Sequence, residues 1–290
     1  MKVAIVADSN SGITQSEAKA LGITVIPTPV IIDDTQYLED ISLTQEQFYE
    51  KLKDDNISVH SSQPSSYDMA ETWRNLLKEY DNIVFIPISS GLSETLHSAQ
   101  HLAEEDEFKG KVFAVDNKRV SITQRSAVMD ALALAKEGKS GEEIAKWLTD
   151  TSMQSSIYIT VATLKYLKKG GRLTPAVAAI GTLLKIKPVL QIQGDKLDQF
   201  KKVRKMSEAK TVMLDAIKTD FTTRFKDLYE AGKMTISVAH TQNLEEAKIF
   251  AEEAKVMFPK AEFRVIDPLS LSVSVHIGPG SLAIACAVKY

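Results

Sequence analysis

Short apolar runs alternate with amphipathic stretches along the first half of the chain. Residues 3–7, 83–88 and 112–115 are continuous apolar runs, which is typical of strands buried on both faces. The stretches between and after them predict helices at residues 16–21, 44–53, 65–79, 93–105, 121–137 and 142–151. This alternation predicts an α/β domain in which helices cover both faces of a parallel sheet.

Capping signals support two of these helices. Gln47 follows Thr44 by three residues, the spacing of a capping box, and Ser140 provides a similar start for the helix at 142–151. Residues 24–32 differ, because this extended segment contains two prolines. Proline cannot donate to a sheet ladder, so the segment is predicted to be an edge strand or an irregular one.

The pattern changes after about Ser155. Hairpin signals now mix with helices, and a tight turn at Gly194-Asp195 separates two strand-like runs. The predicted strands are 157–164, 188–193, 196–202, 234–240 and 262–266, the predicted helices are 175–184, 207–225 and 244–258, and 273–276 and 282–288 are two short strands or a strand and a helix. We therefore expect an α/β domain at 1–155 and an α+β domain with a mixed or antiparallel sheet at 156–290.

Composition narrows the class of protein. The 290 residues are 44% hydrophobic and 25% charged, as in soluble globular proteins, and the net charge of -3 gives no overall attraction to nucleic acid. The single cysteine, Cys286, lies in an apolar run and suits a reducing cytoplasm. No window approaches the 18 or so apolar residues of a membrane span. The sequence thus predicts a cytoplasmic protein, and a transient contact with a membrane surface stays open.

Hydroxyl-rich loops suggest a binding site for an anion. The 89–95 loop, SSGLSET, joins a buried strand to a helix, the 61–65 loop, SSQPS, also precedes a helix, and Asp8-Ser9 ends the first strand. Carboxyl ends of parallel strands meet at one sheet edge, and helix N-termini attract anions. A loop of this kind taken alone is better explained as a plain helix cap, so the prediction rests on the convergence of the loops.

Two loops in the second half add a cation and a histidine. Arg172 follows two glycines, so its guanidinium can approach a carboxylate or phosphate closely. His276 begins the 276–280 loop, HIGPG, and can donate to an anion or relay a proton. Taken singly, Arg172 is as readily an exposed turn residue, and a lone histidine such as His276 more often has a structural role.

Other chemistry has weak support in the sequence. The run KKVRK at 201–205 is a solvated strand end or, alternatively, a docking surface for an acidic partner. His97 and His101 have helical spacing, but Ser98 stands where a zinc protease has its glutamate. No nucleotide-binding motif is present, so we expect no metal and no cofactor.

These loops, in this order, resemble the DegV family, which includes the fatty-acid-binding subunits of bacterial fatty acid kinase. The 61–65 loop is similar to the family's TSQPS, and the 89–95 loop is similar to its SSxLSGT. The family's GGR followed by IKP is matched by LKKGGR at 167–172 with IKP at 186–188, and the 276–280 loop completes the match. The resemblance covers essentially the whole chain.

The resemblance implies a two-domain carrier that holds one long-chain fatty acid in a tunnel between the domains. A partner kinase would phosphorylate the bound acid to an acyl phosphate for phospholipid synthesis, and the carrier alone would not be an enzyme. The implied positions are Ser61, Ser62, Ser93, Thr95, Arg172 and His276 for the carboxylate, Ile180, Leu183 and Ile186 for the acyl chain, and Lys202 and Arg204 for docking the kinase.

Two other functions stay open. The first is an acyl- or phosphoryl-transfer enzyme that uses Ser93 and His276, although the chain has no G-x-S-x-G elbow. The second is a sensor of another small anion. Glu94 stands where the family has glycine, and its carboxylate would suit a ligand that carries a hydrogen-bond donor.

Overall fold

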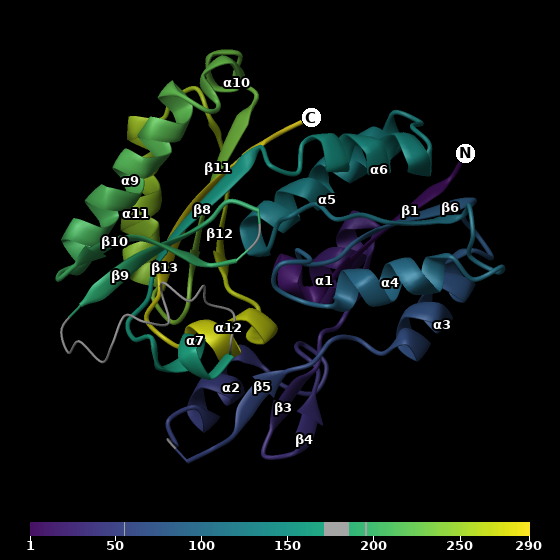
Figure 1. The fold of residues 1–290 in the computed structure, drawn as a ribbon, viewed down its shortest axis with the longest axis horizontal. Helices are drawn as coiled ribbons and strands as arrows, with labels where there is room; N and C mark the ends of the chain where they lie inside the picture. Colours follow the sequence, from purple (N-terminus) through teal and green to yellow (C-terminus); the bar gives the residue numbers. More distant parts are fainter. Residues whose placement is uncertain (55, 171–185, 195) are drawn as a thin grey trace. The chain divides into compact units, whose positions relative to one another are not determined.

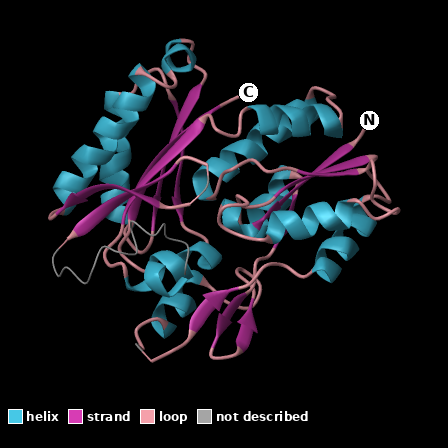
Figure 2. Ribbon diagram, in the orientation of Figure 1, coloured by secondary structure: helices cyan, strands magenta, loops and turns pink. Residues whose placement is uncertain are grey.

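A computed structural model describes residues 1–54, 56–170, 186–194 and 196–290 of the chain (Figure 1). Contacts divide the chain into two compact units. Unit 1 comprises Met1–Met153, Ser270–Val273 and Tyr290, and unit 2 comprises Gln154–Leu269 and Ser274–Lys289. No sheet is shared between the units in the part of the chain that the structure describes (Figure 2).

Unit 1 contains a four-stranded parallel sheet in the order β2-β1-β6-β7. Its strands are β1 (Val3–Asp8), β2 (Thr24–Ile26), β6 (Asn82–Ile86) and β7 (Val112–Ala114). The helices of the unit are η1 (Ser9–Ser11), α1 (Gln15–Leu21), α2 (Gln45–Lys51), α3 (Ser66–Leu76), α4 (Thr95–Ala103), α5 (Ser121–Lys136) and α6 (Gly141–Asp150). The predicted capping boxes at Thr44 and Ser140 are both formed.

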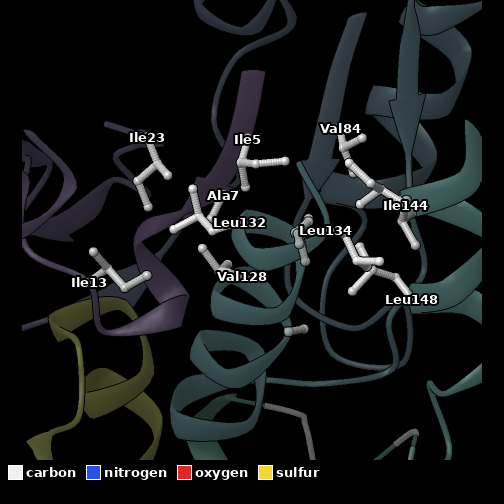
Figure 3. Close-up of a cluster of buried hydrophobic side chains, with 14 of the residues drawn as sticks. Ile5, Ala7, Ile13, Ile23, Val84, Val128, Leu132, Leu134, Ile144 and Leu148 are labelled. Carbon is white, nitrogen blue, oxygen red and sulfur yellow. The ribbon is translucent and has the colours of Figure 1, made fainter. Parts of the chain in front are cut away.

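Alternate residues of the strands enter two separate cores, one on each face of this sheet. Ile5 and Ala7 of β1 pack with residues of α1, α5 and α6 (Figure 3). Ala4 and Val6 pack on the opposite face with residues of α3 and α4, around Trp73. Because side chains alternate along a strand, an uninterrupted apolar run serves both cores.

A second, three-stranded antiparallel sheet belongs to unit 1, in the order β4-β3-β5. Its strands are β3 (Val30–Ile32), β4 (Thr35–Tyr37) and β5 (Val59–Ser61). The segment 24–32, predicted as one edge or irregular strand, is thus interrupted: β2 is an edge strand of the parallel sheet, whereas β3 is the central strand of this second sheet. Pro27 and Pro29 lie between these two strands, where neither has to donate to a ladder.

Unit 2 contains a six-stranded mixed sheet in the order β10-β9-β8-β13-β11-β12. Its strands are β8 (Ser155–Thr160), β9 (Lys187–Ile192), β10 (Asp198–Val203), β11 (Met234–His240), β12 (Glu262–Pro268) and β13 (Leu282–Val288). Its helices are α7 (Lys165–Gly170), α9 (Met206–Thr222), α10 (Lys226–Glu230) and α11 (Leu244–Met257). Helix α9 packs on β8, β9, β10 and β13, whereas α11 packs on β11 and β12.

Helix α12 (Leu271–Ile277) completes the fold, and the boundary between the units passes through it. The short strand predicted at 273–276 is therefore wrong, whereas the strand predicted as one alternative for 282–288 is found as β13. The predicted parallel sheet in the first half and mixed sheet in the second are confirmed. The helix predicted at 175–184 lies outside the described residues.

Candidate functional site

Asp8 lies at the carboxyl edge of the parallel sheet, where its side chain holds other parts of the protein in place. Its side chain is fully buried; Oδ1 accepts from Gln124 Nε2 at 3.0 Å and from the Asn10 amide at 3.1 Å. Oδ2 accepts from the Ile88 amide at 2.9 Å, one residue before the 89–95 loop. Burial raises the pKa of Asp8, and these hydrogen bonds oppose the rise. Because its oxygens serve the protein itself, Asp8 fixes the loop rather than a ligand.

The 61–65 loop is placed by the small antiparallel sheet. Ser61 ends β5 opposite Val30, and the Ser62 amide donates to the Pro29 carbonyl at 3.0 Å. The Ser62 side chain is exposed, whereas Ser65 caps α3 by accepting from the Asp68 amide at 3.0 Å. The loop thus uses the Ser65 hydroxyl as a helix cap, and the predicted ligand residues Ser61 and Ser62 precede it in the chain.

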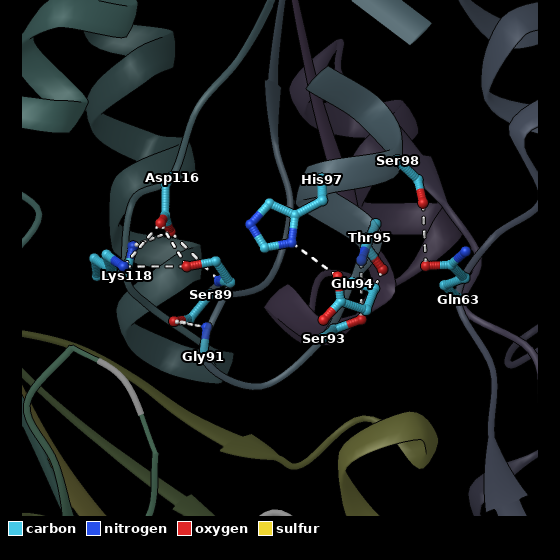
Figure 4. Close-up of polar contacts among 11 residues, drawn as sticks. Gln63, Ser89, Gly91, Ser93, Glu94, Thr95, His97, Ser98, Asp116 and Lys118 are labelled. Carbon is cyan, nitrogen blue, oxygen red and sulfur yellow. Dashed lines mark hydrogen bonds and ion pairs between the residues drawn. The ribbon is translucent and has the colours of Figure 1, made fainter. Parts of the chain in front are cut away.

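The 89–95 loop forms a closed turn that leads into α4. The amides of Leu92 and Ser93 both donate to the Ser89 carbonyl, at 3.0 and 3.2 Å. Ser93 Oγ lies 2.9 Å from Thr95 Oγ1 and accepts from the Thr95 amide at 3.3 Å (Figure 4). The predicted site residues Ser93 and Thr95 are therefore brought together at the N-terminus of α4. Both of these hydrogen bonds join the Ser93 hydroxyl to Thr95, which is not a base.

The 61–65 loop contacts the helix that follows the 89–95 loop. Ser98 Oγ, on the first turns of α4, donates to Gln63 Oε1 at 3.4 Å (Figure 4). This contact places the 61–65 loop beside the helix that begins at Thr95. Hydroxyl donors and the N-terminus of a helix are groups that stabilise a carboxylate or phosphate.

The carboxylate of Glu94 interacts with His97. The Glu94 side chain is 78% exposed, and Oε2 lies 2.8 Å from Nδ1 of His97, three residues later on α4. An exposed carboxylate is well screened, so its repulsion of a bound anion is weak. The glutamate at this position is therefore compatible with an anion at the hydroxyl pair.

In unit 2, Thr241 fixes the 276–280 loop. Thr241 Oγ1 donates to the Gly278 carbonyl at 2.6 Å and accepts from the Ser281 amide at 2.9 Å, while the Gly280 amide donates to the Thr241 carbonyl at 2.7 Å. His276 is half-buried on the last turn of α12, directly before this clamped segment. No local sequence pattern points to Thr241, because it acts on residues that lie almost forty positions away.

The other predicted positions lie in unit 2 or outside the described residues. Ile186 is half-buried next to the start of β9, and Lys202 and Arg204 are exposed on and just after β10. The Arg204 amide donates to Glu208 Oε2 at 3.0 Å, which fixes the backbone under its exposed side chain. The positions outside the described residues are Arg172, Ile180 and Leu183.

A metal site needs a cluster of ligating side chains, and a membrane span needs a long apolar helix. Within the described ranges, no three or more His, Cys, Asp or Glu side chains are grouped so that they could hold a metal ion. The helices described here also include none with the length and apolarity needed to cross a membrane.

Comparisons with known proteins agree over the whole chain. A family model described as "uncharacterised protein, DegV family" matches residues 2–289. Protein DegV of Bacillus subtilis is 30% identical over 100% of both chains, and a DegV domain-containing protein of Clostridium perfringens is 30% identical over 98% of this chain and 96% of its own.

Solved structures are similar over the same length. A protein of Thermus thermophilus, described as fatty acid binding of a DegV family protein, has a TM-score of 0.88 and 28% identity, covering 99% of this chain and 100% of its own. DegV of Bacillus subtilis, described as a fatty acid binding protein, has a TM-score of 0.84 and 30% identity, with 100% of both chains covered.

Proposed function

Because the chain belongs to the DegV family, we propose that it binds one long-chain fatty acid through hydroxyl groups that hold the carboxylate. The observation that carries this proposal is the pair of hydroxyls on Ser93 and Thr95, 2.9 Å apart at the start of α4. The fatty-acid-binding relatives of 28% and 30% identity, similar over the full chain, support the choice of ligand.

The chemistry of these groups suits a carboxylate. Hydroxyls and helix N-terminal amides donate hydrogen bonds, and such bonds to an ionised acceptor are stronger than those between neutral groups. Ser61 and Ser62 would add donors from the neighbouring loop, and His276 and Arg172 would complete the head-group site. The acyl chain would supply most of the affinity, since each buried CH₂ contributes roughly 0.8 kcal/mol. Ile180, Leu183 and Ile186 are the proposed wall positions.

The direct test is denaturing mass spectrometry of small molecules that co-purify with the native protein. We expect a long-chain fatty acid in a one-to-one ratio to protein. A protein that carries none, and that takes up none from a panel of added fatty acids, would contradict the proposal. An added panel of acyl esters tests the competing enzyme function, for which we expect no turnover.

Replacement of Ser93 by alanine tests the head-group assignment. We expect Ser93→Ala to weaken fatty acid binding roughly tenfold, because a hydrogen bond to a charged group contributes about 1.5–3 kcal/mol. The matched control is Ser16→Ala, which removes an exposed hydroxyl on α1. Dissociation constants measured on delipidated protein decide the matter. Equal affinity of Ser93→Ala and wild type would remove Ser93 from the site.

We propose further that the chain is a carrier subunit that presents its ligand to a fatty acid kinase. The docking positions would be Lys202 and Arg204, whose side chains are exposed at the end of β10, an edge strand of its sheet. Lys201 and Lys205 add exposed positive charge beside them, which suits an acidic partner surface.

Charge reversal tests the docking assignment. We expect the double variant Lys202→Glu, Arg204→Glu to bind fatty acid as wild type does but to lower the rate of acyl phosphate formation at least about tenfold with the ATP-binding kinase subunit, because like charges now oppose encounter. The control is Lys146→Glu, Lys139→Glu, which reverses two exposed lysines near α6. A docking variant that is phosphorylated as fast as wild type would contradict this role.

A further inference from the structure

Three residues join the connection after β7 to the 89–95 loop. Ser90 Oγ donates to Asp116 Oδ2 at 2.6 Å, and Lys118 Nζ lies 3.1 Å from Ser90 Oγ and 2.9 Å from Asp116 Oδ2 (Figure 4). Asp116 Oδ1 also accepts from the backbone amides of Ser90 and Lys118, at 3.4 and 3.3 Å. Both carboxylate oxygens are therefore used to hold Ser90 and Lys118.

The cluster is an ion pair rather than a catalytic dyad. A lysine activates a serine only when its amine is neutral, and Asp116 stabilises the charged ammonium of Lys118. Burial raises the pKa of Asp116, but hydrogen bonds from Ser90 and Lys118 outweigh it and hold that pKa below its usual range. The side chains of Lys118 and Asp116 are 31% and 23% exposed, so the pair is partly shielded from solvent.

The backbone around the pair is also held in a costly conformation. Lys118 has a φ of 54° and Ser121 has the same value, in the left-handed region that residues with a Cβ seldom adopt. The connection is tied to the strand-end segment by Asn117 Nδ2, which donates to the Pro87 carbonyl at 2.8 Å. The Ser89 amide donates to the Arg119 carbonyl at 2.9 Å. These two hydrogen bonds hold the backbone of the connection after β7 in this conformation.

Ser90 links the connection after β7 to Ser93 in the candidate head-group site. It lies within the turn that the Ser89 carbonyl closes by accepting from the Ser93 amide, so fixing Ser90 restricts where Ser93 can lie. We propose that Asp116 and Lys118 are positioning residues that hold the Ser93 hydroxyl in place for the carboxylate of the ligand. This inference rests on the proposed fatty acid binding and deepens it.

The test separates positioning of the head group from general stability. Hexadecanoic acid and hexadecanol share an acyl chain, and only the acid carries a carboxylate. Their dissociation constants would be measured by displacement of a fluorescent fatty-acid analogue from delipidated protein. For Asp116→Asn and for Lys118→Met we expect affinity for the acid to fall about tenfold and affinity for the alcohol to change less than twofold, because the chain contacts are intact.

Two comparisons make the outcome decisive. Lys146→Met breaks an exposed ion pair with Asp150 on α6 and should leave the acid-to-alcohol ratio unchanged. The double variant Asp116→Asn, Ser90→Ala should bind the acid as tightly as whichever of the two single variants binds it less tightly. Both single changes act on the same contact between Ser90 Oγ and Asp116 Oδ2, so their effects should not add. Suppose that the ratio of acid to alcohol affinity is reduced in Ser93→Ala but unchanged in Asp116→Asn and Lys118→Met. That result would overturn the positioning role of Asp116 and Lys118 and leave the proposed fatty acid binding intact. A wild-type protein that does not prefer the acid would overturn the proposed function instead.

Discussion

Replacement of Gly278 by alanine is expected to lower the free energy of unfolding by about 3 kcal/mol and to disorder the segment that follows His276. Gly278 has a φ of 74°, a conformation that costs a residue with a Cβ about 1 kcal/mol. A Cβ at this position would also lie 2.2 Å from Cδ2 and 2.4 Å from Cε2 of Tyr166, on α7. The ring has to move, and displacing a packed side chain costs about 1–3 kcal/mol more.

Two matched comparisons separate the two contributions. Gly138 has a φ of 82°, and nothing lies within 4 Å of the position that an added Cβ would take, so Gly138→Ala measures the backbone cost alone. Tyr166→Ala removes the ring, and we expect Gly278→Ala to be less costly in that background than in wild type. Chemical denaturation of wild type, the three single variants and the double variant gives the energies. Equal costs for Gly278→Ala and Gly138→Ala would show that Tyr166 does not restrict the loop.

The sequence predicts those parts of the fold that depend on local patterns. The uninterrupted apolar run of β1 and the capping box from Thr44 to Gln47 both have signals within a few residues, and both are found in the structure. Strand β5 is not predicted, because its three residues are too few to show an alternation of apolar and polar positions. Its residue Ser61 pairs with Val30, about thirty positions earlier in the chain. Short edge strands depend on such distant pairing rather than on their own sequence.

The same distinction applies to the candidate site. Ser93 and Thr95 are two positions apart, so their proximity can be predicted from the sequence. The contact of Ser90 with Asp116 cannot, because it depends on β6 and β7 being neighbours in the sheet. The sequence places Asp8 in an anion-binding loop, yet its burial and its bond to the Ile88 amide give it a structural role. A buried acid at a strand end has the same appearance in sequence whichever role it has.

Glu39 is expected to make the folded protein less stable as the pH rises from about 4 to about 8. Its Oε2 accepts from the amide of Leu271 at the start of α12, and its Oε1 accepts from Gln45 Nε2, each at 2.8 Å. Burial raises the pKa of Glu39 to about 7, with the charge of Asp40 adding to the rise and the two hydrogen bonds opposing it. The folded protein therefore keeps a proton on Glu39 at a pH where the unfolded chain has lost it.

The sign and size of the effect follow from this difference. Below the ordinary pKa of 4.5 the carboxyl is protonated in both states, and its stabilising contribution is fully present. As the pH rises towards 7, Glu39 ionises in the unfolded chain before it does so in the folded one. The free energy of unfolding therefore falls, by about 3 kcal/mol in total. Glu39→Gln keeps an oxygen acceptor for the Leu271 amide but cannot titrate.

Denaturant titrations of wild type and Glu39→Gln across this pH range isolate the contribution of one carboxyl. We expect the stability of wild type, relative to that of the variant, to fall by about 3 kcal/mol from low to high pH. Glu79→Gln, an exposed change after α3, should follow wild type throughout. Parallel curves for wild type and Glu39→Gln would mean that Glu39 ionises alike in the folded and unfolded chains. In that case the amide of Leu271 would be bonded to an ordinary carboxylate, and the start of the helix that carries His276 would not respond to pH through Glu39.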